Sequence, residues 1–442
     1  MKQKRRLEQY QDMIPRLFPE LSAAGEDGTK CLPRPVTFQV TDNCNLNCSY
    51  CYQINKGTRR MSFETAKKYV DMLLNATPEN DAYINPVVSP AIILEFIGGE
   101  PLLEIELIDQ IVDYFKIQAI EKMHPWATKY CISMCSNGVL YFDKKVQQFL
   151  TKHRNHLSFS ITIDGNKELH DSCRVFPDGK TGSYDIAVAG AKDWISKGNY
   201  MGSKITIAPE NLKYLYSAVT HMVELGYRDI NANCVYEKYH ATEFYYQLKK
   251  IADYLLGIDD DIYCSLFEEN FFHPKEATDL DNWCGGNGMM LSCDPDGWLY
   301  PCIRYMESSL GTDVKPIRIG HVDTGIGATK CDRDCIKCVQ SIDRRTQSTD
   351  ECFYCPIAEG CSWCSAYNYQ EFGTPDKRAT YICWMHKARA LANAYYWSHY
   401  YSKMGSREIF KFYMPDEWAL KIIDQKELDM LKKLKNVEVC KI

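Results

Sequence analysis

Three cysteines near the amino terminus have the spacing of a ligand set for a metal cluster. Cys44, Cys48 and Cys51 follow one another as Cys-x3-Cys-x2-Cys on one short segment. Thiolates this close along the chain can converge on three irons of a cubane [4Fe–4S] cluster. The fourth iron then has no ligand from the chain, and the amino and carboxylate groups of S-adenosyl-L-methionine (AdoMet) can chelate it. Such a site predicts one-electron cleavage of AdoMet to a 5′-deoxyadenosyl radical, with the chain supplying binding, orientation and shielding.

Two other interpretations of this triad stay open at the level of spacing alone. Zinc knuckles use similar spacings, so the triad can be a zinc site that lacks its fourth ligand. The three thiols can also be unrelated. The residues that follow along the chain have to decide between these interpretations.

Composition and charge exclude several classes of function. The 442 residues carry a net charge of −6, so no basic field attracts nucleic acid or an anionic membrane surface. The basic opening is not followed by an apolar segment, and the longest apolar stretch, 91–97, is too short to span a bilayer. We therefore expect a cytoplasmic protein with no nucleic-acid or membrane partner. In that compartment the grouped cysteines among the 21 are expected to hold metal, and none is expected to form a disulfide framework.

Alternating and helical patterns between residues 35 and 240 predict the elements that must position the first triad. Strand-like segments alternate with segments of helical spacing, which is typical of repeated βαβ units around a parallel sheet. Ser62 is a plausible N-cap for the first helix, 62–74. Six strands predict an open, partial (β/α)6 barrel of the TIM type. The expected strands are 36–41, 92–97, 130–134, 157–163, 205–208 and 230–234.

Short polar motifs follow the successive strands, and their order resembles that of radical AdoMet enzymes. Because the carboxyl ends of parallel strands form one mouth of a barrel, these motifs are expected to line the same cavity. The resemblance implies that they bind AdoMet, with the glutamate holding its amino group and the arginine facing its carboxylate. The residues concerned are Tyr50, Gly98, Gly99, Glu100, Pro101, Ser136, Asn137, Ser160, Asp164 and Arg174.

A second group of cysteines resembles the SPASM domain found in many radical AdoMet enzymes. The pattern is Cys-x(9–15)-Gly-x4-Cys followed by Cys-x2-Cys-x5-Cys-x3-Cys and a last cysteine; here the final spacing is x2. The resemblance implies two auxiliary [4Fe–4S] clusters, three in all with the first triad; a structural zinc domain is the alternative. It implies a proximal set of Cys284, Cys302 and Cys364, with or without a fourth ligand, and a distal set of Cys352, Cys355, Cys361 and Cys383.

A third group, Cys331-x3-Cys335-x2-Cys338, repeats the spacing of the first triad without its glycine-rich context. One member can complete the proximal set, the triad can bind a metal of its own, or the thiols can lie in a surface loop. The sequence does not distinguish these interpretations.

The predicted domain organisation follows from these groups. We expect an N-terminal extension (1–34), the partial barrel (35–240), a bridging region (241–283), the SPASM domain (284–384) and a helical C-terminal segment (385–442). Segment 284–383 has little periodicity, which predicts irregular structure, a β-hairpin at Asp294–Gly297 and a need for metal to fold.

The resemblance implies a peptide-modifying enzyme with an external one-electron donor of the flavodoxin or ferredoxin type. The tract 347–364 resembles maturases of Cys-rich repeat peptides, which favours thioether cross-linking of a ribosomally made precursor peptide. Only 43 residues precede Cys44, so we expect a separate protein or the barrel itself to recognise the leader. Formylglycine formation of the sulfatase-maturase type, carbon–carbon cross-linking and epimerisation are alternatives. An iron–sulfur electron carrier explains the cysteines but not Glu100, Asp164 and Arg174.

Overall fold

A long mixed sheet organises the amino-terminal half of the chain. The computed structural model describes residues 33–81, 83–268, 271, 274–280 and 284–440, so the predicted extension 1–34 lies almost entirely outside the described residues. Strands β1 to β4 run parallel in that order, which confirms the predicted βαβ pattern. The bounds are β1 Arg34–Thr41, β2 Ile92–Gly98, β3 Tyr130–Ser136 and β4 Leu157–Ile161.

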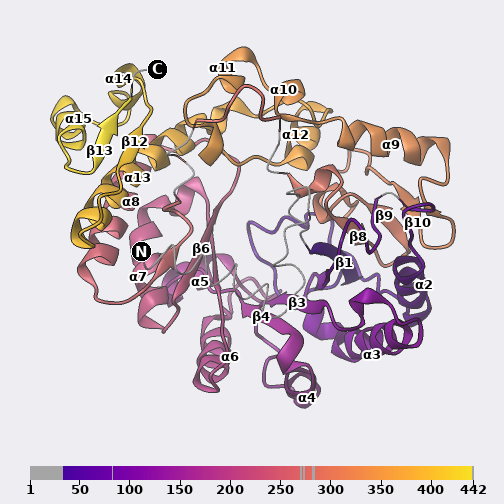
Figure 1. The fold of residues 1–442 in the computed structure, drawn as a ribbon. Helices are drawn as coiled ribbons and strands as arrows, with labels where there is room; N and C mark the ends of the chain where they lie inside the picture. Colours follow the sequence, from indigo (N-terminus) through magenta and orange to yellow (C-terminus); the bar gives the residue numbers. More distant parts are fainter. Residues whose placement is uncertain (1–32, 82, 269–270, 272–273, 281–283, 441–442) are drawn as a thin grey trace.

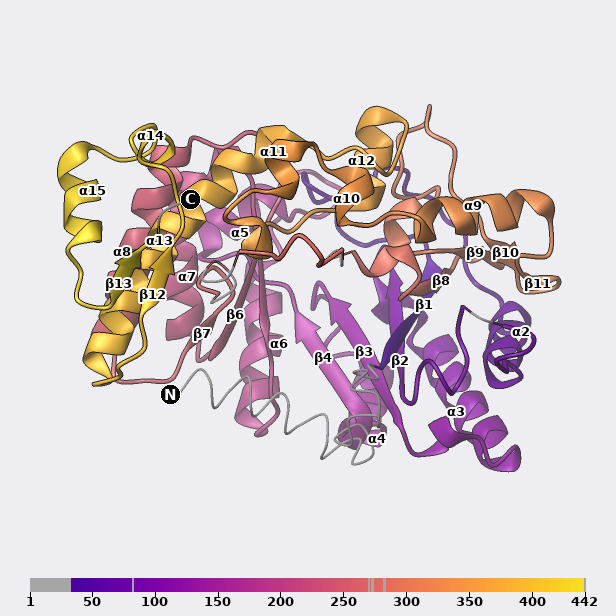
Figure 2. The ribbon, with the colours of Figure 1, turned by 45° about the horizontal axis from the view of Figure 1, so that its top comes forward.

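The next strands form a separate sheet, so the predicted six-strand barrel is divided. Strands β5 (Ser203–Ile207), β6 (Asp229–Cys234) and β7 (Tyr263–Cys264) pair in parallel with one another. Figures 1 and 2 show the two sheets curving toward each other around a common interior. The α/β, partial-barrel fold is thus confirmed, and in the described residues the barrel does not close.

The strands of the first sheet have two unlike faces. In β2, Leu94 and Phe96 are fully buried, and the Phe96 ring stacks 5.2 Å from Phe38 of β1, which in turn meets Tyr69 of a covering helix. The alternate residues of the strand, such as Glu95, are only half-buried. A filled TIM barrel would carry apolar layers on this inner face. The alternation therefore indicates an interior that holds a cavity instead of side-chain layers.

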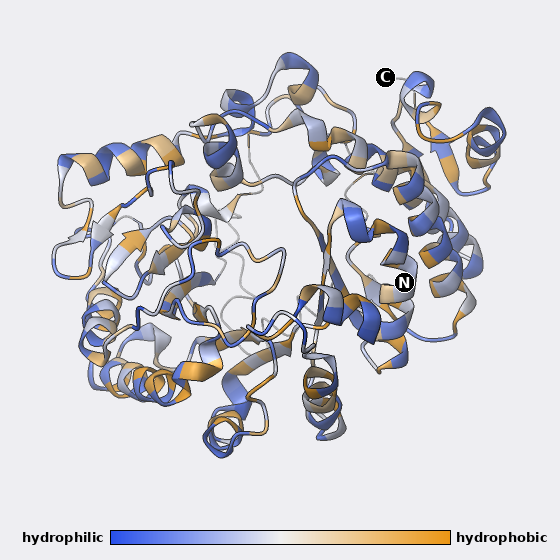
Figure 3. Cartoon of the chain, turned by 180° about the vertical axis from the view of Figure 1, so that it is seen from behind, coloured by the Kyte–Doolittle hydropathy of each residue, from blue (hydrophilic) through white to orange (hydrophobic). Residues whose placement is uncertain are grey.

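Helices cover the outer faces of the sheets and begin and end at recognisable signals. Ser62 caps the first of them by accepting a hydrogen bond from the Thr65 backbone N–H, as predicted. Apolar and polar residues alternate around these helices in Figure 3, as amphipathic cover requires. They are α2 Phe63–Leu74, α3 Ile105–Glu121, α4 Lys144–Lys152, α5 Lys167–Cys173, α6 Tyr184–Ser196, α7 Leu215–Glu224 and α8 Ala241–Gly257.

The cysteine-rich segment is attached directly to the first sheet. Strand β8 (Leu291–Cys293) pairs in parallel with β1, and β9 (Trp298–Tyr300), β10 (Gly320–His321) and β11 (Gly325–Ile326) extend the sheet as antiparallel strands. The predicted hairpin is present: Gly297 has φ of +93° at its turn, a conformation that favours glycine. The helices that follow lie along the edge where β1 to β4 end (Figure 2).

Segment 284–383 contains more regular structure than its composition predicts. Four helices occur in it: α9 Lys330–Gln340, α10 Arg344–Gln347, α11 Asp350–Phe353 and α12 Ser365–Phe372. Three of them, α10, α11 and α12, are one or two turns long and give too few repeats for a periodic pattern, because such helices depend on side-chain caps and tertiary packing.

The C-terminal segment begins with the expected long helix, α13 (Cys383–Lys403), which packs beside α8 (Figure 1). It also contains a small parallel sheet of β12 (Phe410–Phe412) and β13 (Val437–Val439) that the sequence reading did not foresee. Two short helices, α14 (Asp416–Ala419) and α15 (Gln425–Lys432), lie between these strands. No described helix is both long and apolar enough to cross a bilayer.

Candidate active site

A cavity of about 370 Å³ occupies the interior at the carboxyl ends of the strands. Cys44, Cys48 and Cys51 line one part of it, on the loop that joins β1 to α2. Its volume lies within the range of small-molecule sites. The mouth position is the one that parallel α/β folds use for chemistry.

Two glycines allow the end of β2 to lie against the cysteine loop. Gly99 N–H donates to the Thr41 carbonyl at 3.0 Å, and Glu100 N–H donates to the Asn43 carbonyl at 2.9 Å. A Cβ on Gly98 would lie 2.6 Å from the Thr41 carbonyl oxygen, and one on Gly99 would lie 2.2 Å from that of Asn43. Any other residue here would push the cysteine loop away from the sheet.

Glu100 joins the ends of β2 and β3. Its carboxylate, 1% exposed, accepts hydrogen bonds from Leu102 N–H (3.0 Å), Ser136 Oγ (2.8 Å) and Asn137 N–H (2.8 Å). Burial raises the pKa of Glu100, and these three donors act against that rise. The Asn137 amide in turn donates to Asn45 Oδ1 at 2.7 Å, next to Cys44. The acid thus orients the turn after β3 against the cysteine loop.

Asp164 lies behind the cavity wall and positions two residues that form it. Its carboxylate, 1% exposed, accepts from Arg174 Nε at 2.7 Å, from the Tyr50 hydroxyl, and from Thr206 N–H at 3.2 Å. Burial lowers the pKa of Arg174, but Asp164, Tyr50 and Cys48 together outweigh that effect, so the pKa is raised and the guanidinium stays charged. Arg174 Nη1 lies 3.9 Å from Cys48 Sγ. A fixed positive charge therefore faces the thiol triad.

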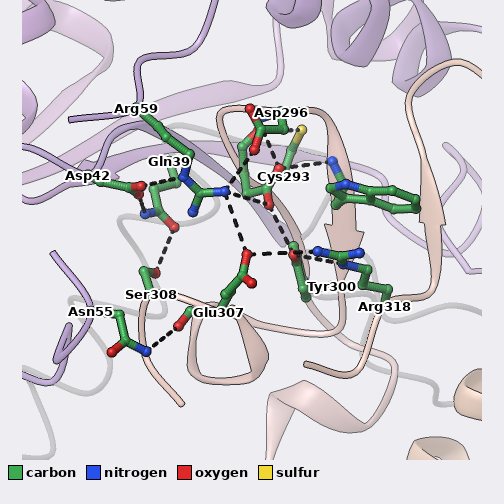
Figure 4. Close-up of polar contacts among 12 residues, drawn as sticks. Gln39, Asp42, Asn55, Arg59, Cys293, Asp296, Tyr300, Glu307, Ser308 and Arg318 are labelled. Carbon is green, nitrogen blue, oxygen red and sulfur yellow. Dashed lines mark hydrogen bonds and ion pairs between the residues drawn. The ribbon is translucent and has the colours of Figure 1, made fainter. Parts of the chain in front are cut away.

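A polar network ties the flanks of the cysteine loop to the hairpin region (Figure 4). Arg59 donates to Asp42 at 2.6 Å and to Asp296, in the β8–β9 turn, at 2.7 Å. Asn55 Nδ2 donates to the carbonyls of Glu307 (2.9 Å) and Leu310 (2.7 Å). The loop that carries the first triad is thus held on both sides by residues more than 200 positions away.

The proximal set of cysteines comes together beneath a glycine. A Cβ on Gly286 would lie 3.3 Å from Cys302 Sγ and 3.5 Å from Cys284 Sγ. Burial raises the pKa of Cys302, and the nearby thiols of Cys364 and Cys284 raise it further. Despite its unusual spacing, Cys364 therefore lies with the two cysteines expected, and Cys284 Sγ contacts Ser365 Oγ at 3.0 Å.

The distal set also gathers in one place. Burial raises the pKa of Cys383 to about 12, and Cys361, Cys352 and Cys355 contribute to the rise. Burial likewise raises the pKa of Cys355 to about 11, again with Cys361 and Cys352 beside it. The structure thus brings together the four residues expected.

Nearly all residues expected to bind AdoMet reach the cavity. The exception is Asp164, which acts from behind through Arg174 and Tyr50. The expected residues that line the cavity are Tyr50, Gly98, Gly99, Glu100, Pro101, Ser136, Asn137, Ser160 and Arg174, beside the three cysteines of the first triad.

Several further lining residues were missed by sequence reasoning. Some lie on the inner faces of the strands and others lie beside the cysteines. Alternation within each strand is the signal that could have indicated the residues on the inner faces. They include Glu95, Ser133, Cys135, Ser158, Lys204, Thr206, Tyr52, Lys56 and Ile303. The cavity lining therefore combines apolar surface with polar side chains of both charges.

The chain offers donors that fit an iron–sulfur cluster with AdoMet. Three thiols converge at one end of the cavity, and burial raises the pKa of Cys44 to about 11, so cluster binding would displace its proton. The Arg174 guanidinium suits a carboxylate, and the backbone at Gly98 and Gly99 is open to close approach. When bound, the cluster and AdoMet would together supply a 5′-deoxyadenosyl radical.

Another group of potential metal ligands is already neutralised by a lysine side chain. Asp109, Asp113 and His153 place one ligand atom each within 4.8 Å of one another. Lys152 Nζ lies 2.8 Å from Asp109 and 2.5 Å from Asp113. The ammonium therefore takes the place that a cation would have.

Comparison with known proteins places the chain among cluster-binding proteins. A family model described as a 4Fe-4S single cluster domain matches residues 27–172. An uncharacterized protein of Methanocaldococcus jannaschii is 30% identical over 268 residues, which is 58% of this chain and 84% of the relative.

Two characterised relatives are more distant. The subtilosin biosynthesis protein AlbA of Bacillus subtilis is 24% identical over 63% of this chain. The radical SAM cyclopropyl synthase TigE of Paramaledivibacter caminithermalis is 23% identical over 61%. The chain spans 57% of the length of each.

The fold is also that of a solved structure, native anSMEcpe with bound AdoMet and a Cp18Cys peptide. The TM-score is 0.61 at 18% identity, over 84% of this chain and 99% of that one. With the cysteine triad, the strand-end motifs and the relatives in agreement, the chain belongs to the radical AdoMet (radical SAM) family of enzymes.

Proposed function

We propose that this protein is a peptide maturase that forms thioether cross-links from cysteines of a ribosomally made precursor peptide. Binding of AdoMet and a [4Fe–4S] cluster at Cys44, Cys48 and Cys51 would provide the radical. The proximal and distal cysteine sets would bind two auxiliary clusters, which gives three in total. The predicted domain boundaries, with the SPASM domain at 284–384, belong to the same proposal.

One observation carries the proposal: the cavity extends from the first triad to Ile303, the residue that follows Cys302 of the proximal set. It is lined by Cys51 and Tyr52 on one side and by Ile303, the neighbour of Cys302, on the other. A substrate in this cavity would touch both the radical source and the proximal cluster. The three thiols of the proximal set are one fewer than a cubane has irons, which would leave a position for a substrate thiolate.

Glu95 is the residue we propose as proton acceptor for the substrate thiol. The carboxylates that line the cavity in the described residues are Glu95 and Glu100. Both oxygens of Glu100 accept hydrogen bonds from the chain. Glu95 uses Oε2 to accept from Thr37 Oγ1 at 2.6 Å, which leaves Oε1 for substrate. The thiol S–H bond would break with its proton passing to Oε1 and the electron pair staying on sulfur.

Relatives support a peptide substrate but not one particular bond. AlbA takes part in the biosynthesis of a bacteriocin, TigE is named a cyclopropyl synthase, and the anSMEcpe structure holds a peptide. Carbon–carbon bond formation is therefore the second candidate. Formylglycine formation is disfavoured because Ile303 follows Cys302, where sulfatase maturases carry an aspartate base.

The proposed partners follow from the same chemistry. Reduction of the clusters needs an external one-electron donor of the flavodoxin or ferredoxin type. Leader recognition would fall to a separate protein or to the barrel. We place the reaction in the cytoplasm, where thiols stay reduced.

The proposal is tested by mass spectrometry of a peptide product. The anaerobically reconstituted enzyme is incubated with AdoMet, a reductant and a Cys-rich peptide encoded beside its gene. We expect 5′-deoxyadenosine, loss of two hydrogens per cross-link, and cysteines that resist alkylation. If hydrogens are lost while every cysteine can still be alkylated, the reaction forms carbon–carbon bonds and not thioethers.

Two matched controls separate the steps. A peptide with its cysteines changed to serine should keep its hydrogens under the same conditions. Glu95→Gln should still cleave AdoMet but cross-link about 10²-fold more slowly, as expected on loss of a general base. If Glu95→Gln cross-links at the wild-type rate, Glu95 is not the proton acceptor, while the maturase proposal stands.

A further inference from the structure

The third cysteine triad lies on a helix, unlike the first. Thr329 caps the start of α9: its Oγ1 accepts from Asp332 N–H at 3.1 Å, and Asp332 Oδ2 accepts from Thr329 N–H at 2.9 Å. The helix therefore begins just before Cys331. Positions 331, 335 and 338 are spaced i, i+4 and i+7, which places their side chains on one face.

This thiol face is accessible at its ends and packed at its centre. Cys331 and Cys338 are exposed, whereas Cys335 is half-buried against the apolar cluster around Tyr300 and Met306. Burial raises the pKa of Cys335 to about 11, and the Cys331 thiol, in hydrogen-bond contact with it, and that of Cys338 add to the rise. The central thiol therefore has a neighbour on each side.

The surroundings of the thiol face separate it from the cluster-binding sets. The groups that act on Cys335 and Cys338 are the other thiols of the triad, Asp332 and Asp376. The pKa of Cys302 and Cys364 responds to the proximal thiols instead. In this structure Cys335 thus forms part of a separate thiol group, although it packs on the same apolar cluster as Cys302.

Helix geometry limits what this group can bind. At 1.5 Å rise per residue, Cys331 and Cys338 are separated by about 10.5 Å along the axis. Two thiolates on one ion, each at about 2.3 Å, lie within about 4.6 Å of each other. A single ion therefore cannot bind the two outer thiols in an intact helix, but it can bind Cys335 with either neighbour. Thiolate ligands select soft ions such as zinc over magnesium or calcium.

We propose that α9 carries a metal site for one soft divalent ion of the zinc class, with Cys335 as the common ligand and Cys331 or Cys338 as the second. Water completes the coordination, so the ion exchanges readily. Because both possible pairs share Cys335, the helix holds one ion and not two. The site is independent of the radical chemistry and of its substrate.

The test uses the holoenzyme with its cluster sites filled, so that those thiols do not compete. Co²⁺ is titrated anaerobically, and thiolate-to-cobalt charge-transfer absorbance reports binding. Iodoacetamide footprinting, read by peptide mass spectrometry, locates the protected cysteines. We expect one equivalent of Co²⁺, displaced by Zn²⁺, with protection centred on Cys335.

Three serine variants give the pattern that identifies the site. Cys335→Ser should abolish the charge-transfer band and the protection. Cys331→Ser and Cys338→Ser should each retain one ion with less than about tenfold weaker affinity, since one pair remains. Thermal melts of the three variants check that each of them folds. No band in the wild-type holoenzyme, or equal binding by Cys335→Ser, would overturn the proposal.

Discussion

The spacing Cys-x3-Cys-x2-Cys occurs twice in this chain, and the structure gives it two different shapes. Cys44, Cys48 and Cys51 lie on an irregular loop that lines a cavity. Cys331, Cys335 and Cys338 lie on a capped helix and face outward at both ends. The loop lets three thiols converge, whereas the helix holds its outer thiols about two turns apart.

The conformation of the backbone, and not the spacing, therefore decides what a cysteine triad can bind. The first triad is held by distant residues: Arg59 and Asn55 bind the hairpin region, and Glu100 and Asp164 orient the motifs around it. Within the part of the chain that the structure describes, the third triad is held by its own helix and by the apolar cluster beneath Cys335. Radical chemistry needs the first arrangement, because residues on several sides must contact AdoMet at the same time to orient it.

The strongest test of this comparison is a matched pair of serine variants. Cys48→Ser should abolish formation of 5′-deoxyadenosine, because a cubane bound by two thiols is not held in the cavity. Cys335→Ser should leave the rate within about twofold of wild type, because Cys335 does not line the cavity that holds the first triad. Both rates are measured by chromatography of 5′-deoxyadenosine, normalised to iron content. Equal loss in the two variants would remove the distinction between the triads.

Asp164→Asn tests whether the first triad depends on a residue behind the cavity. Loss of the carboxylate charge releases Arg174 and Tyr50 from their shared partner. We expect kcat/KM for AdoMet cleavage to fall about 10²-fold, the scale of a misplaced binding group. An Asp343→Asn variant, at the cap of α10, should leave cleavage unchanged and serves as the control.

Sequence reasoning succeeded wherever local pattern and function coincided. The strands before Cys44, Gly98 and Ser136 have long alternating or apolar runs, and their ends carry the motifs. It missed Glu95 and Lys204, because a polar residue inside a strand looks the same whether it faces solvent or an open interior. It also missed α9, whose thiols and charges hide an 11-residue helix that only its cap and packing reveal.

The division of the barrel and the small C-terminal sheet were beyond local patterns. Whether Ser203–Ile207 pairs with β4 or begins a new sheet depends on long-range packing, and not on the strand itself. Strands of three residues, such as Phe410–Phe412, are too short to show alternation.

The pH dependence of the free energy of unfolding tests the buried polar residues that surround the first triad and have, among the described residues, no counterpart around the third. Burial lowers the pKa of His170 to about 4; its Nδ1 accepts from Asp164 N–H at 3.3 Å. Between about pH 6.5 and pH 4 the histidine is protonated in the unfolded chain, where its pKa is about 6.5, but neutral in the folded protein. The free energy of unfolding therefore decreases as pH falls through this range.

The full effect is about 3 kcal/mol in the free energy of unfolding, from the pKa difference of about 2.5 units. Denaturant titrations between about pH 7 and pH 5 should show a steeper decline for wild type than for His170→Gln. Parallel pH profiles would mean that protonation of His170 does not set this dependence.

The smallest expected effect concerns α9. Thr329→Ala removes the cap and should destabilise the helix by about 1 kcal/mol. Amide exchange over 330–340 should quicken and Co²⁺ affinity should fall by up to about fivefold, while AdoMet cleavage is unchanged. An unaltered exchange rate would show that packing against the apolar cluster, and not the cap, maintains the helix.

The central claim is that a radical formed at the first triad abstracts hydrogen from a peptide in the adjoining cavity. Its most direct test is incubation of the reconstituted enzyme with AdoMet, a reductant and a precursor peptide deuterated at its carbon-bound positions, followed by mass analysis of 5′-deoxyadenosine. We expect deuterium in the 5′-deoxyadenosine, at a yield that matches the cross-links formed. A protein with its full complement of iron that makes no 5′-deoxyadenosine, or only unlabelled 5′-deoxyadenosine beside a cross-linked product, would contradict it.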